Sequence, residues 1–162
     1  MPEGVIELEN VSFAINGQAI LSKVNMSIPA GDFMAMIGPN GGGKTTLLKL
    51  ILGLLKPAGG SIRVLGRPAG NRSHRIGYVP QNTHINPEFP ISALDVVLMG
   101  QLQPGNRHLR HSKKDRVAAH EALNRMGMGA YCHRRIGQLS GGQRQRVFIA
   151  RALVSEPKLL VL

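Results

Sequence analysis

Apolar and polar positions in the first part of the chain alternate with the period of two that is typical of strands. Residues 5–11 (VIELENV) alternate in this way and read as an edge strand, and residues 20–28 (ILSKVNMSI) repeat the pattern. Asn16 and Gly17 lie between the two segments and favour a tight turn. We therefore expect an antiparallel hairpin near the N-terminus.

A continuous apolar run, Phe33 to Ile37, predicts a buried strand that ends at Gly38, after a turn over residues 29–32. A helical pattern then runs from Lys44 to Leu54. Two further short strands are expected over residues 58–66 and 75–80. These elements predict a small antiparallel sheet beside a strand and helix of α/β type.

Beyond residue 81 the pattern changes to the helical period. Ser92 and Asp95 are placed to cap a short helix that runs to about Met99. A polar, basic loop over residues 101–111 follows. Ser112 then begins a longer helix with one apolar face, which a glycine at position 127 is placed to end.

The phrase GPNGGGKTT at residues 38–46 has the form G-x-x-x-x-G-K-[ST] and lies between the predicted strand and helix. Glycines allow backbone N–H groups to point at phosphate oxygens, and the helix N-terminus adds a partial positive charge. The Lys44 ammonium can reach the β- and γ-phosphates, and the Thr45 hydroxyl can ligate Mg²⁺. The phrase therefore predicts a loop that binds a nucleoside triphosphate.

A second phrase, LSGGQRQR at residues 139–146, opens another amphipathic helix. Ser140 is a good N-cap residue, and Gln143 three residues later completes the S-x-x-Q pattern of a capping box. Val147, Ala150 and Val154 form the apolar stripe of this helix. Small residues at a helix N-terminus expose N–H groups and a hydroxyl, which suit an anionic γ-phosphate.

Together these phrases resemble the nucleotide-binding domain of ABC transporters, from about Val5 to Leu162. GPNGGGKTT resembles Walker A, Gln81 in GYVPQ resembles the Q-loop, and LSGGQ resembles the signature motif. The resemblance implies an α/β fold: a P-loop NTPase core with an antiparallel β subdomain and an inserted α-helical lobe. It assigns residues 1–85 to the nucleotide-binding core and 86–138 to the lobe. Residues 139–162, the signature helix and the start of the Walker B strand, return to the core.

The same resemblance implies roles for individual residues. Two such domains pair head to tail, as a homodimer or with another ATPase domain, and each ATP lies between Walker A of one and the signature of the other. Lys44 and Gln81 are the implied catalytic residues, and Thr45 and Gln81 the implied contacts of Mg²⁺. The implied γ-phosphate contacts across the dimer are Ser140, Gly141, Gly142 and Gln143. The implied ATP-binding residues are Gly38, Pro39, Asn40, Gly41, Gly42, Gly43, Lys44, Thr45 and Thr46.

The sequence departs from the family pattern in two places. Its last residues, Leu159 to Leu162, resemble the Walker B strand just before its Asp and Glu. We therefore expect these 162 residues alone to hydrolyse ATP at no more than background. The second departure is Ile15, which stands where the family usually carries an aromatic residue that stacks on adenine, with Phe13 two residues away. We expect contact with the base to be weak and mostly apolar.

Composition narrows the class of protein. The chain is 43% hydrophobic, so it can bury a sizeable core, and a single cysteine, Cys132, excludes an internal disulfide. The N-terminus lacks the apolar region of a signal peptide, and no apolar stretch is long enough for a membrane span. We expect a cytoplasmic protein that lies on the inner face of the cell membrane only through partner subunits.

The net charge of +11 is concentrated in the second half of the chain, where residues 101–151 hold eleven Lys or Arg and two acids. Such a surface suits nucleic acid, acidic headgroups or an acidic partner. A solvated helical face accounts for it more simply, and we expect no direct binding of nucleic acid.

Residues 76–100 most resemble ATP-binding subunits of importers for zinc, manganese or related metals. The resemblance thus implies an ATPase that powers import of a metal ion or metal complex through transmembrane permease subunits. A DNA-repair ATPase of the same superfamily would place a long coiled coil between Gln81 and Leu139, and no heptad run lies there. A translation factor of the superfamily, or a fragment that only binds nucleotide, stays open.

Overall fold

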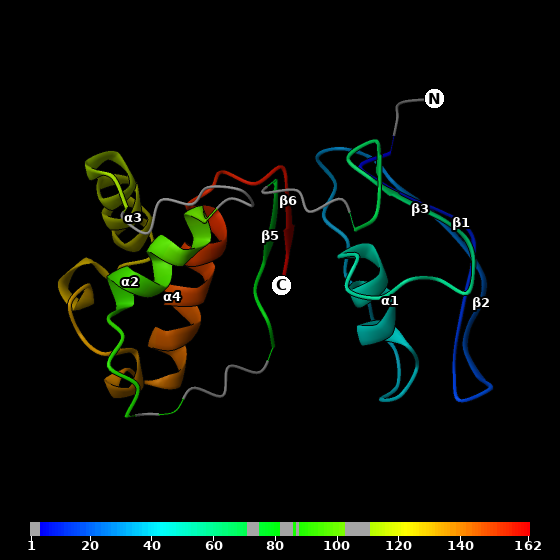
Figure 1. Ribbon diagram of the computed structural model, residues 1–162, viewed down its shortest axis with the longest axis horizontal. Coiled ribbons are helices and arrows are strands. Elements are labelled where there is room, and N and C mark those ends of the chain that lie inside the picture. The colour runs from blue at the N-terminus through cyan, green and yellow to red at the C-terminus, as the bar shows by residue number, and fades with distance from the viewer. Residues whose placement is uncertain (1–3, 71–74, 82–85, 87, 103–110) are drawn as a thin grey trace. The chain divides into compact units, whose positions relative to one another are not determined.

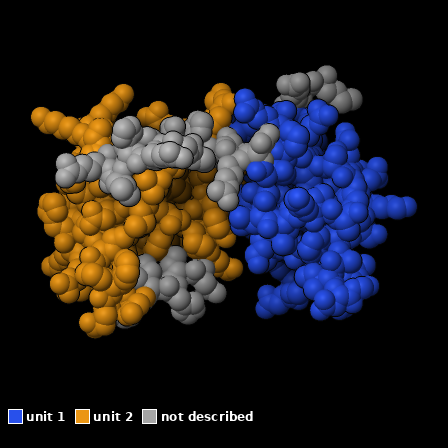
Figure 2. Space-filling view, viewed as in Figure 1, with its two compact units in different colours: residues 1–73 blue, residues 74–162 orange. Residues whose placement is uncertain are grey.

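The computed structural model (Figure 1) describes residues 4–70, 75–81, 86, 88–102 and 111–162. The chain divides into two compact units, residues 1–73 and residues 74–162, which Figure 2 shows in separate colours. No helix among the described residues is both long and apolar enough to cross a membrane.

Unit 1 contains an antiparallel sheet in the strand order β2-β1-β3-β4. The predicted hairpin is confirmed: β1 (Ile6–Ile15) pairs with β2 (Gln18–Ile28), and Asn16 and Gly17 form the turn with φ of 50° and 79°. The remaining strands, β3 (Gly59–Val64) and β4 (Arg67–Pro68), form a second hairpin. The sequence pattern indicated β3 and missed the two-residue β4.

The expectation that residues 5–11 form an edge strand is wrong. β1 pairs with β2 on one side and with β3 on the other, where Ile6 lies opposite Val64 and Leu8 opposite Ile62. Alternation arises because one face of the sheet is covered, and Ile6 and Leu8 are accordingly buried. This pattern is the same for a central and an edge strand, so it does not distinguish them.

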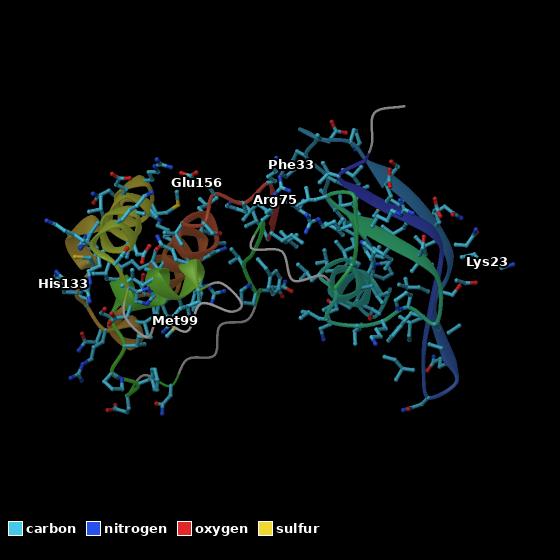
Figure 3. All side chains as sticks on the ribbon, turned by 45° about the horizontal axis from the view of Figure 1, so that its top comes forward. Lys23, Phe33, Arg75, Met99, His133 and Glu156 are labelled. Atoms are coloured by element: carbon cyan, nitrogen blue, oxygen red, sulfur yellow. The ribbon has the colours of Figure 1, made fainter. Side chains whose placement is uncertain are left out.

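The predicted buried strand over residues 33–37 is also absent. These residues carry no strand hydrogen bonds, and Phe33, labelled in Figure 3, is 91% exposed while Ile37 is 93% exposed. A strand requires a neighbour that accepts and donates its backbone hydrogen bonds. Within the described residues of unit 1, no strand of the sheet pairs with this segment, and the side chains of Phe33, Met34 and Ile37 are exposed.

The helix α1 (Lys44–Ile51) begins at the predicted residue and ends three residues before the predicted end. It contacts β3 and buries Leu47, Leu50 and Ile51. Gly53, which follows it, has a φ of 69°. A residue with positive φ cannot continue a right-handed helix, so the chain turns away there.

Unit 2 combines a two-stranded parallel sheet with helices. The strands β5 (Ile76–Tyr78) and β6 (Leu159–Val161) pair in parallel and lie side by side in Figure 1. The helices are α2 (Ala93–Leu98), α3 (Lys113–Arg125) and α4 (Gly141–Leu153). The described residues of the unit also form short 3₁₀ helices, η1 (Met99–Gln101), η2 (Gly129–Tyr131) and η3 (Ile136–Gln138).

All three predicted N-caps in unit 2 are confirmed. Ser92, Ser112 and Ser140 each accept a hydrogen bond from the backbone N–H three residues later, and each is part of a complete capping box. The basic loop expected over residues 101–111 lies for the most part outside the described residues.

The helices α2, α3 and α4 share one hydrophobic core. Val97, Leu123 and Val147, one from each helix, are all fully buried in it. The signature helix therefore packs with the helices expected to form the inserted lobe, in the same compact unit. The division of the chain at residues 85 and 138 stays a prediction.

Candidate functional site

The glycine-rich loop between residues 38 and 46 bends sharply because two of its glycines adopt left-handed backbone angles. Gly41 has a φ of 82° and Gly43 a φ of 81°. The Gly42 N–H donates to the Pro39 carbonyl at 3.2 Å, which closes the turn. Side chains with a Cβ rarely adopt these angles, so the loop needs glycine at both positions.

The Lys44 ammonium folds back over this loop. Its Nζ donates to the carbonyls of Gly38 at 2.7 Å and Pro39 at 2.6 Å. The positive charge is thereby held at the mouth of the loop, and the third N–H of the ammonium has no partner in the described part of the chain. A phosphate oxygen would compete well for this charge, because hydrogen bonds to ionised groups are the strong ones.

The loop leads directly into the N-terminus of α1. Gly43 is its N-cap and provides no side-chain cap, and the first turn contains no acidic residue. The first intrahelical bond to Gly43 comes from the Leu47 N–H at 2.8 Å. Among the described residues, no acceptor bonds to the N–H groups of Lys44, Thr45 or Thr46, so these donors and the helix dipole are free for an anion.

The residues present fit a nucleoside triphosphate with Mg²⁺. The free amides and the Lys44 ammonium suit phosphate oxygens, and Thr45 exposes its side chain at the start of the helix, where its hydroxyl oxygen can serve as a ligand. Asn40 is also exposed on the loop. When bound, Mg²⁺ would neutralise charge on the phosphates.

The signature segment forms a second helix N-terminus of the same chemical kind. The Gln143 N–H donates to Ser140 Oγ at 3.3 Å, and the Ser140 N–H donates to Gln143 Oε1 at 3.0 Å. The amides of Gly141 and Gly142 are left without acceptors within the described residues, and both glycines are exposed with nothing within 4 Å of an added Cβ. The Ser140 O–H and the side-chain Nε2–H groups of Gln143 can still donate, so this surface offers several donors to an anion.

The other predicted site residues lie on the surface of their units. Gln81 belongs to unit 2 and is exposed in a bend that follows Pro80. Ile15, the last residue of β1, is 49% exposed, and Phe13 is half-buried. Their proximity to a bound nucleotide stays a prediction.

Arg151 was not indicated by any sequence motif, but it makes two specific contacts in the structure. Arg151 on α4 donates from Nη2 to the Tyr78 carbonyl at 3.4 Å, and its guanidinium lies 4.9 Å from the centre of the Phe148 ring. Arg151 and Tyr78 are 73 positions apart in the sequence. No short motif marks such a contact, although an arginine among the apolar residues of a helix is a sign that it has a specific partner.

The chain is similar to known ATP-binding proteins of transport systems. The chain is 45% identical over 154 residues to the zinc transport system ATP-binding protein TroB of Treponema pallidum, covering 95% of this chain and 58% of that protein. It is 46% identical over 148 residues to the manganese transport system ATP-binding protein MntB of Bacillus subtilis, covering 91% and 59%. The chain thus spans about six tenths of the length of these curated relatives.

Solved structures share the fold. A metal-chelate type ABC transporter in an inward-facing conformation matches with a TM-score of 0.84 and 35% identity, covering 98% of this chain and 59% of that one. A nucleotide-free ATP-binding cassette from an ABC transporter matches with a TM-score of 0.83 and 26% identity, covering 97% and 67%. The observed fold is accordingly part of the mixed α/β ABC ATPase fold, with its antiparallel β subdomain and helical lobe.

The sequence model of the family described as "ABC transporter" matches residues 21–162, which include the loop around Lys44, Gln81 and the signature helix. Because this match covers most of the chain, the protein belongs to the ABC transporter family.

Proposed function

We propose that the protein is the ATP-binding subunit of an ABC importer for a metal ion or metal complex, and that the intact subunit hydrolyses ATP. The observation that carries the proposal is the geometry at the start of α1. There a lysine ammonium and a tight glycine loop meet three helix amides that have no acceptor among the described residues, in a first turn without acidic residues.

In this proposal the residues from Gly38 to Thr46 hold the phosphates and Thr45 ligates Mg²⁺. Lys44 supplies the charge that offsets the γ-phosphate as it is transferred. Phosphoryl transfer needs positioning and electrostatic stabilisation rather than covalent chemistry from the protein, so these groups suffice for that part of the task. Gln81 contacts the metal and the attacking water.

The signature residues act on the nucleotide of a partner ATPase domain. Ser140, Gly141, Gly142 and Gln143 present donors at an exposed helix N-terminus, which suits the γ-phosphate of an ATP bound elsewhere. Two such surfaces that meet around ATP convert its binding energy into domain closure. The subunit reaches the inner face of the membrane through permease subunits.

The metal cargo is supported by the relatives, whose names specify zinc and manganese transport systems. A repair-type ATPase is disfavoured by the segment between Gln81 and Leu139. Its longest described helix has 13 residues, which is too short for an extended coiled coil.

Lysine substitution tests the proposal. We expect Lys44→Ala to weaken Mg²⁺-ATP binding roughly tenfold to a hundredfold, because a hydrogen bond to a charged group contributes about 1.5–3 kcal/mol. Lys49→Ala is the matched control, since Lys49 is exposed in the last turn of the same helix. Isothermal titration of the 162-residue chain with ATP and Mg²⁺ measures both affinities.

Equal affinities of the two variants would refute the proposed phosphate site, as would an unmodified chain that does not bind ATP. Turnover assays on the same samples test the expectation about hydrolysis. ATP hydrolysis by the 162 residues above background, abolished by Lys44→Ala, would contradict that expectation and leave the binding proposal intact.

A further inference from the structure

Arg151 links the signature helix to the strand end that leads to Gln81. Its Nη2 donates to the carbonyl of Tyr78, the last residue of β5, and Gln81 is three residues further along the chain. The guanidinium is also held against the Phe148 ring at 4.9 Å. The arginine therefore contacts a backbone group of one element and an aromatic side chain of its own helix.

The surroundings of Arg151 are unfavourable for a charge. The side chain is half-buried, and burial lowers the pKa of its guanidinium below the ordinary value. No carboxylate forms an ion pair with it in the described part of the chain. Among the described residues, this partly desolvated cation is compensated by one carbonyl and one ring face, so an apolar residue would fill the same space at lower cost.

The backbones around this contact approach closely. A Cβ added to Gly77 of β5 would lie 2.6 Å from the Ala152 carbonyl, and one added to Gly100 of η1 would overlap the Arg151 carbonyl. On its other side, the residue after β5 is tied to β6, because the Val79 N–H donates to the Val161 carbonyl at 2.9 Å. The C-terminal half of α4 therefore has little room to slide along β5.

We propose that Arg151 is a positioning residue that fixes the end of β5, and with it the start of the segment that carries Gln81, to the signature helix. The inference rests on the proposed function for its relevance to ATP. If ATP binds as proposed, the link keeps the segment that carries Gln81 in a fixed position relative to Ser140 and Gln143. Binding of a nucleotide at the signature residues then also changes the position of Gln81.

Hydrogen exchange of the 162-residue chain tests the contact directly. We expect Arg151→Met, which keeps much of the aliphatic side chain but removes the charged donor, to speed exchange of the Val79 amide, which donates to the Val161 carbonyl, roughly tenfold to a hundredfold. Arg151→Lys, which can still donate to the Tyr78 carbonyl, should restore most of the protection. Arg146→Met is the control, because Arg146 is exposed on the same helix.

Unchanged exchange at the Val79 amide in Arg151→Met would overturn the proposal. Faster exchange spread evenly over α2 and α3 would also overturn it, since it would show a general packing role. If Arg151→Met does not fold, the proposal is judged on Arg151→Lys, which must protect the Val79 amide more than Arg151→Gln does. Titration with ATP tests the proposed function independently of hydrogen exchange. A chain that does not bind ATP would refute the proposed function, whereas the exchange result would still test the Arg151 contact.

Discussion

Two glycines of the glycine-rich loop, Gly41 and Gly43, have almost the same φ and different surroundings, which allows backbone strain and steric crowding to be separated. A Cβ added at Gly41 meets nothing within 4 Å. A Cβ added at Gly43 would lie 3.0 Å from Leu21 Cδ2 and 3.3 Å from the Ile20 carbonyl. Gly41→Ala therefore introduces left-handed strain alone, whereas Gly43→Ala adds steric overlap with β2.

The magnitudes follow from these contacts. An alanine in the left-handed conformation destabilises the folded state by about 1–2 kcal/mol. Replacing glycine by alanine also reduces the entropy of the unfolded chain, which stabilises the protein by about 0.4–1 kcal/mol. We expect Gly41→Ala to lower the free energy of unfolding by about 1 kcal/mol. Overpacking costs a further 1–3 kcal/mol or so, and we expect Gly43→Ala to lose about 2–4 kcal/mol in all.

Urea unfolding followed by far-UV circular dichroism measures both losses. Leu21→Ala provides the double-mutant cycle, because it removes the atom that the new Cβ would meet. The cycle should show that Gly43→Ala is less destabilising when Leu21 is truncated. Equal losses for Gly41→Ala and Gly43→Ala, or a cycle with no coupling, would refute the reasoning about crowding.

Two further predictions concern the helix caps. Ser140→Ala removes the acceptor of the Gln143 N–H and should lower the free energy of unfolding by about 1 kcal/mol while leaving ATP affinity at Lys44 unchanged. Calorimetry measures the loss of stability, and titration with ATP measures the affinity. A lower ATP affinity in Ser140→Ala would contradict the expectation that the signature residues do not contribute to ATP binding at Lys44. Hydrogen bonds from the Ser112 backbone and side chain lower the pKa of Asp115. The capping box of α3 therefore adds stability above the unfolded-state pKa of this aspartate, and the contribution is lost as pH falls through the lowered folded-state pKa. In an acid titration followed by circular dichroism, Asp115→Asn should lack this part of the pH dependence, and identical titrations of variant and parent would contradict it.

Local features of the fold could be predicted from the sequence. The turn at Asn16 and Gly17, the start of α1 at Lys44 and the caps at Ser92, Ser112 and Ser140 are all where the residue patterns placed them. In each case the deciding interaction joins residues a few positions apart, or depends on the backbone freedom of one glycine. Such interactions are encoded within a short window of sequence.

Features that depend on distant neighbours were decided by the tertiary structure. The alternation in β1 does not reveal that a strand lies on each side of it, and the apolar run from Phe33 to Ile37 remains exposed without a pairing strand in unit 1. The contact between Arg151 and Tyr78 joins residues 73 positions apart. By itself, the sequence determined where hydrogen-bond donors can gather for a phosphate. Which strands acquire partners and which arginine becomes half-buried against a distant carbonyl depend on long-range packing, because only the folded chain brings those backbone groups within bonding distance.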